Sequence, residues 1–146
     1  MSATNAFETA LLEHYFQNAA IANVGDAAGL PASVGAGSVY ISLHTADPGE
    51  AGDQTTSEAT YTGYARKAVA RSGAGWAVTG NTADNAAAVT FASCTGGTNT
   101  ITHFGIGSAA TGVGNLRFYG ALTSSLAVSS GITPSFAIGT LDVSVN

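Results

Sequence analysis

From Ser38 onward, the chain consists of short segments of alternating apolar and polar residues, each closed by turn residues. In the first segment Val39, Ile41 and Leu43 occupy every second position, which is the period of a half-buried strand. The Asp-Pro-Gly at residues 47–49 then stops the segment, because proline cannot donate to a strand ladder and glycine tolerates the positive φ of a turn. A chain divided in this way is expected to form short strands.

Seven later segments carry the same signal. We expect strands near residues 64–71, 76–79, 86–92, 100–107, 116–122, 126–128 and 135–145. Short strands at this spacing, separated by glycine-rich turns, are typical of a β-sandwich, a jelly roll or a small barrel.

The residues before the strands predict a helix over residues 5–22. Apolar side chains recur there at spacings of three and four, among them Phe7, Leu11 and Tyr15. This stripe could pack on its own domain or dock on another subunit. With 146 residues the chain is predicted to be a single domain. We expect an N-terminal helix and loop over residues 1–38, followed by an antiparallel β-sandwich or jelly roll over residues 39–146.

Charged side chains are scarce, and this limits the kinds of partner. They make up 9% of the residues, against about 25% in ordinary domains. Four Lys and Arg in a chain of net charge −5 cannot form the basic face that nucleic acid requires. No apolar run approaches the roughly 18 residues of a membrane span. A surface with so few charges suits an assembly in which it faces identical copies or other proteins.

Acidic and basic residues occupy different stretches of the chain. Residues 46–62 hold four acids and no base, and the following predicted strand holds three of the four bases. Complementary charges can fix the register between identical copies. The acids could instead form an ordinary solvated loop, or bind calcium, although the EF-hand spacing is absent. We expect partner contacts at Asp47, Glu50, Asp53, Glu58, Arg66, Lys67 and Arg71, and on the helix at Phe7, Leu11 and Tyr15.

No catalytic signature is present. The Gly-x-Gly pairs lack the third glycine of a dinucleotide fingerprint, so we expect no cofactor. His14, His44 and His103 lack the spacing of metal ligands; His44 and His103 could meet across a sheet, but an ordinary hydrogen-bonded histidine is the favoured interpretation. The single cysteine, Cys94, is expected to be a small buried side chain. The sequence therefore indicates a protein that binds and does not catalyse.

Several stretches are similar to a known family. They are LHTADPGEAG at residues 43–52, YTGYAR at residues 61–66, and residues 85–91, 102–106, 120–123 and 131–136. In order and spacing they resemble a family of small virion proteins of tailed bacteriophages, over most of the chain from Val39 onward. The resemblance implies a structural component of the particle, assembled in the bacterial cytoplasm, and brings no catalytic residues.

Two placements in a virion compete. A capsid decoration protein that binds the major capsid protein is favoured, because the chain is predicted to be one small β domain with an N-terminal segment suited to docking. A tail or tail-fibre protein that binds a host receptor is the alternative, and the lack of a long repetitive shaft counts against it. A secreted carbohydrate-binding β-sandwich is a third class, which the absence of a signal peptide pattern at the N-terminus disfavours.

Overall fold

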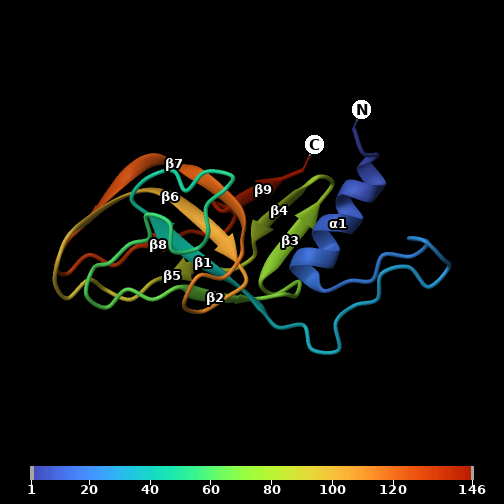
Figure 1. The fold of residues 1–146 in the computed structure, drawn as a ribbon, viewed down its shortest axis with the longest axis horizontal. Coiled ribbons are helices and arrows are strands. Elements are labelled where there is room, and N and C mark those ends of the chain that lie inside the picture. The colour runs from blue at the N-terminus through green and yellow to red at the C-terminus, as the bar shows by residue number, and fades with distance from the viewer. Residues whose placement is uncertain (1, 146) are drawn as a thin grey trace. The chain divides into compact units, whose positions relative to one another are not determined.

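The computed structural model describes residues 2–145, and within them it contains one helix and nine strands (Figure 1). In chain order the elements are α1 (Asn5–Gln17), β1 (Ser38–His44), β2 (Lys67–Ala70), β3 (Trp76–Thr79), β4 (Thr82–Asn85), β5 (Val89–Thr90), β6 (Asn99–Gly107), β7 (Leu116–Val128), β8 (Ser135–Phe136) and β9 (Asp142–Ser144). The predicted class, mainly β with one N-terminal helix before antiparallel sheets, is confirmed. No helix in this part of the chain is both long and apolar enough to span a membrane.

Contacts along the chain group it into two compact units. The helix unit comprises residues 2–38, 70–88 and 136–145, and the sheet unit comprises residues 39–69 and 89–135. The single domain expected from the sequence stays a prediction.

The sheet unit is built on four strands in the order β2-β1-β6-β7. β1 and β6 pair antiparallel, so that Ile41 lies opposite Ile106 and Leu43 opposite Phe104. These four side chains are buried and form one apolar layer. The other face of β1 is buried as well, because Ser42 also has no exposed surface. Because side chains on both faces of β1 are buried, a slip of one residue would disturb both faces, and the pairing register of β1 is therefore well specified.

β7 lies at the edge of this sheet and is irregular. Residues 122–125 of β7 stand opposite the single residue Thr102 of β6, and a second register shift falls beside Arg117. The two predicted segments therefore form one bulged strand. Bulges bend an edge strand and hinder its pairing with another chain.

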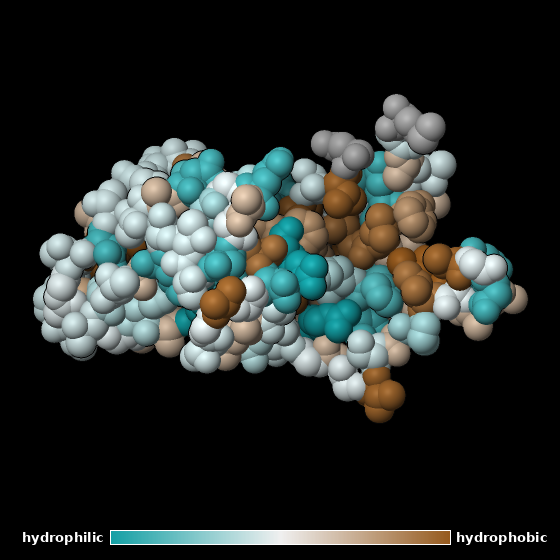
Figure 2. All heavy atoms as spheres, in the orientation of Figure 1, coloured by the Kyte–Doolittle hydropathy of each residue, from teal (hydrophilic) through white to brown (hydrophobic). Residues whose placement is uncertain are grey.

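In the helix unit α1 lies beside β3 and β4. Leu12 and Phe16 are buried, and the ring of Phe16 lies 4.4 Å from that of Trp76. The apolar stripe of the helix is wider than this contact. Phe7 and Leu11 keep 44% and 38% of their surface exposed, and Figure 2 shows apolar surface over α1.

The helix ends five residues before its predicted end. Asn18 takes the left-handed conformation, with φ of 58°, which stops a helix. Its side-chain amide also donates to the carbonyl of Ser33 and accepts from the Ser33 N–H, both at 2.9 Å. The pair of bonds closes the base of the loop between α1 and β1. The helical periodicity of the sequence could not predict this end, because Asn18 is bonded to a residue fifteen positions away.

Candidate functional site

A half-buried phenol, that of Tyr64, organises the candidate site in the sheet unit. The Tyr64 hydroxyl accepts a hydrogen bond from the Leu43 N–H of β1 at 3.1 Å and donates one to Oε1 of Glu58 at 2.8 Å. Burial raises the pKa of Tyr64 far above its ordinary value, so the phenol keeps its proton and remains a donor at neutral pH. The backbone of Glu58 pairs with that of His44, at the end of β1, in an isolated antiparallel β-bridge. Both hydrogen-bond partners of the phenol are therefore positioned by β1.

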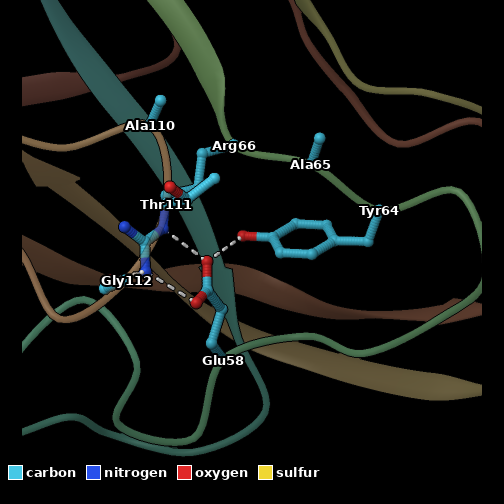
Figure 3. Close-up of a pocket in the computed structure, with 7 residues that line it drawn as sticks. All are labelled: Glu58, Tyr64, Ala65, Arg66, Ala110, Thr111 and Gly112. Atoms are coloured by element: carbon cyan, nitrogen blue, oxygen red, sulfur yellow. Dashed lines mark hydrogen bonds and ion pairs between the residues drawn. The ribbon is translucent and has the colours of Figure 1, made fainter.

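Arg66 completes a two-point ion pair with Glu58. Its Nε donates to Oε1 at 2.6 Å and its Nη2 to Oε2 at 2.8 Å (Figure 3). The Arg66 side chain is 3% exposed and that of Glu58 is 16% exposed. The hydrogen bonds to Glu58 are the main cause of the raised pKa of Arg66. Bidentate geometry of this kind fixes both side chains in direction as well as in distance.

The same guanidinium holds the hairpin that joins β6 to β7. Nη1 donates to the carbonyl of Ala109 at 3.0 Å, and Nη2 donates to that of Gly112 at 2.8 Å. Gln54 holds the hairpin from another side, since its Oε1 accepts the Ala109 N–H at 2.9 Å and its Nε2 donates to the Ala109 carbonyl at 3.3 Å. The hairpin is therefore tied to two other segments of its unit.

Two glycines make room for the buried Gln54 side chain. A Cβ at Gly107 or at Gly114 would collide with Gln54 side-chain atoms. The sequence pattern explained these glycines as parts of turns and strand ends, and it did not identify Gln54 or the hairpin as parts of a site. The paired glycines were the available signal, because glycine also marks close approach of another group.

A hollow of ≈ 240 Å³ lies beside the ion pair. Its walls come from the segment of residues 58–66, which precedes β2, and from the tied hairpin (Figure 3). The lining residues are Glu58, Tyr64, Ala65, Arg66, Ala110, Thr111 and Gly112.

The other predicted acidic contacts lie on the loop before Glu58. Asp47 and Glu50 are exposed, and Asp47 accepts the N–H of Gly49 at 2.8 Å in the predicted turn. Asp53 accepts bonds from the hydroxyl and the N–H of Thr55, and these bonds lower its pKa. Asp53 therefore acts first as a local turn-former.

The other predicted basic contacts differ from each other. Lys67 is exposed on β2. Arg71 belongs to the helix unit and donates to the carbonyls of His14 and Tyr15 at 2.6 Å each, and to that of Ala36 at 3.1 Å. A cation at these last carbonyls of α1 satisfies groups that the helix leaves unpaired.

The predicted contacts on α1 also separate. Phe7 and Leu11 are exposed, whereas Tyr15 is half-buried with its ring edge-on to Phe16 at 4.9 Å. One side of the stripe thus packs on its own unit, as expected, whereas docking of the exposed side on another subunit stays a prediction.

The histidines that were considered as metal ligands, and the cysteine, are the remaining candidates. His44 and His103 do lie opposite each other in β1 and β6, but the ring nitrogens of His44 are bonded to the Thr56 carbonyl and the Ser42 hydroxyl at 2.7 and 2.8 Å. Cys94 is buried, as predicted. Over residues 2–145 no three His, Cys, Asp or Glu side chains form a group that could hold a metal ion.

A comparison with models of protein families identifies a family whose match covers almost the whole chain. A family model described as "Podophage GP4 fiber I protein gp80" matches residues 2–144. No curated protein matches the chain.

Proposed function

Because the chain belongs to the Podophage GP4 fiber I protein gp80 family, which is a family of phage fibre structural proteins, we propose that it is a tail-fibre component that works by binding. The match over residues 2–144 is the observation that carries this proposal. It supports the fibre alternative of the sequence analysis over the capsid decoration that was favoured there. The bulges in the edge strand β7 of the sheet unit also argue against assembly by strand addition at that edge.

The exposed side of α1 is the best candidate for the attachment surface. The helix is already held by Leu12, Phe16 and the bonds from Arg71. Its own unit therefore does not need Phe7 and Leu11, and large apolar side chains left exposed beside each other mark an interaction site. We propose that Phe7 and Leu11 contact another virion protein, with Tyr15 supporting them from the inner side.

Fewer of the predicted charged residues are available for pairing between copies. Glu58, Arg66 and Arg71 are engaged within the chain, so they serve the fold before any partner. The pairing that we still propose is between the exposed Lys67 of one copy and the exposed Asp47 or Glu50 of a second copy.

Phage particles carrying Phe7→Ser and Leu11→Ser test the attachment surface. We expect the double variant to be lost from purified particles while the isolated protein stays folded, since Leu12, Phe16 and the bonds from Arg71 still hold the helix. Ile138→Ser is the matched control, because Ile138 is 68% exposed in the same unit, and it should be incorporated normally. Normal incorporation of the double variant would overturn the assignment.

Antibody labelling of the same particles in electron micrographs tests the placement itself. Label on the tail fibres is the expected result. Label distributed over the capsid shell would overturn the fibre proposal and restore decoration.

A further inference from the structure

We propose that the hollow beside the Glu58–Arg66 pair is a binding site for a neutral saccharide ring. This inference goes beyond the fibre placement and does not depend on it. It rests on the charge, the hydrogen-bonding capacity and the shape of the seven lining residues.

The charges that line the hollow disfavour ionic ligands. Glu58 and Arg66 neutralise each other at 2.6 and 2.8 Å, so the hollow presents no net charge to an anion or a cation. An anion would also have to displace Glu58 from an arginine whose side chain is only 3% exposed. Separating such a pair would leave a buried charge without its partner, which is strongly unfavourable. A neutral ligand can use the pair without separating it.

Hydrogen-bonding capacity favours a hydroxyl donor. A carboxylate has about four acceptor positions, and three at Glu58 are filled: two on Oε1, by Tyr64 and Arg66, and one on Oε2, by Arg66. The open position on Oε2 can accept a ligand O–H, and such bonds to a charged acceptor are the strong ones. The exposed Thr111 contributes a second hydroxyl to the lining. Adjacent donors and acceptors of this kind match the hydroxyls of a sugar.

Shape favours a single ring. The ≈ 240 Å³ of the hollow is smaller than the roughly 300–1,000 Å³ of sites for larger ligands. Ala65, Ala110 and the Tyr64 ring supply apolar wall, which can cover the C–H surface of a sugar. The bonds from Arg66 and Gln54 hold the hairpin in place beforehand, and such pre-organisation lowers the entropic cost of binding.

A purely structural explanation competes with this proposal: the ion pair could only tie the hairpin down. A variant that fills the hollow and keeps the pair separates the two. Ala110 is exposed at the hollow, so Ala110→Trp should occupy it. Val113→Trp is the matched control, since Val113 lies on the same hairpin, is 62% exposed and is not part of the lining.

The experiment is a titration of the full ¹⁵N-labelled chain, followed by two-dimensional NMR, with methyl glycosides of glucose, galactose, mannose, rhamnose and N-acetylglucosamine. We expect at least one glycoside to shift the amides of Ala65, Thr111 and Gly112 with millimolar half-saturation. The shifts should be unaffected by added salt, retained in Val113→Trp and lost in Ala110→Trp. Inorganic phosphate and methylguanidinium should leave these amides unmoved.

Three outcomes would overturn the proposal. No shift with any glycoside would leave the pair as a structural tie only. A response to the charged probes instead of the sugars would contradict the neutral ligand. Equal shifts in Ala110→Trp would place the binding elsewhere. None of these outcomes affects the proposed place in the tail fibre, which is tested separately by antibody labelling of phage particles.

Discussion

Arg66 uses four of its five N–H groups inside the chain: one from Nε, one from Nη1 and two from Nη2. One side chain therefore joins Glu58 to the hairpin that ends β6. A lysine at this position could not make the same set of bonds, because its ammonium lacks the planar fork.

His44 is the residue whose ionisation should couple the fold to pH. It is buried, its pKa is lowered chiefly by that burial, and Glu58, Arg66 and His103 are the charged or titratable groups around it. The unfolded chain then binds the proton more readily than the folded chain, so stability is complete above the ordinary value of 6.5 and falls as the pH drops below it.

We therefore expect the free energy of unfolding to decrease between pH 7.5 and pH 5, with a slope from this group of at most about 1.4 kcal/mol per pH unit. Urea unfolding at several pH values measures it. His44→Gln is the comparison, because it removes the titration and should flatten the slope in that range. An unchanged slope in the variant would assign the effect to other groups.

At the scale of single elements, β6 depends on close contact with its neighbours. A Cβ at Gly105 would lie 2.6 to 2.7 Å from side-chain atoms of Leu116, Ser42 and His44. Gly105 has no positive φ in the structure, so the requirement is for space and not for backbone freedom.

Gly105→Ala should destabilise the protein by about 1–3 kcal/mol, as overpacked cores do, with a lower midpoint in chemical denaturation. Gly35→Ala is the control: nothing lies within 4 Å of its Cβ position, so its midpoint should stay near that of the parent. Equal midpoints for the two variants would mean that the sheet accommodates the extra methyl group.

The sequence predicted those elements whose signal is local. Alternation alone placed a strand on the residues of β1 and gave β3 its observed bounds. β4 was missed because its residues, Thr82–Asn85, include a single apolar side chain, that of Ala83, and its strand conformation depends on pairing with β3 and β9. A strand that is specified by its neighbours leaves a weak pattern in its own residues.

The candidate site was predictable only in part, for a similar reason. Glu58 and Arg66 stood out as charges in a nearly uncharged chain, but their sequence neighbourhood suggested pairing between copies. Their contact with each other and with Gly112, 46 positions beyond Arg66, follows from the tertiary fold. Gln54 had no distinguishing feature, since a buried amide looks like a surface amide in sequence.

On the scale of the whole molecule, the surface is poor in positive charge. Two of the four Lys and Arg residues are engaged by the fold, which leaves Lys67 and Arg117 exposed. Repulsion between copies at neutral pH therefore comes from the acids, and it disappears near the isoelectric point of ≈ 4.8.

Self-association should accordingly rise as the pH approaches 4.8, measured by light scattering at constant protein concentration. Circular dichroism at each pH separates association of the folded protein from acid unfolding through His44. Scattering that is independent of pH while the protein stays folded would show that copies are kept apart by something other than charge.

The clasp between Asn18 and Ser33 has a practical consequence. Because two hydrogen bonds already fix the ends of this loop, lengthening its middle leaves the helix and the first strand undisturbed. The free energy of closing a loop grows only with the logarithm of its length. The exposed stretch around Gly25, whose Cβ position meets nothing within 4 Å, is thus a natural point at which to graft a foreign epitope or an affinity tag for display.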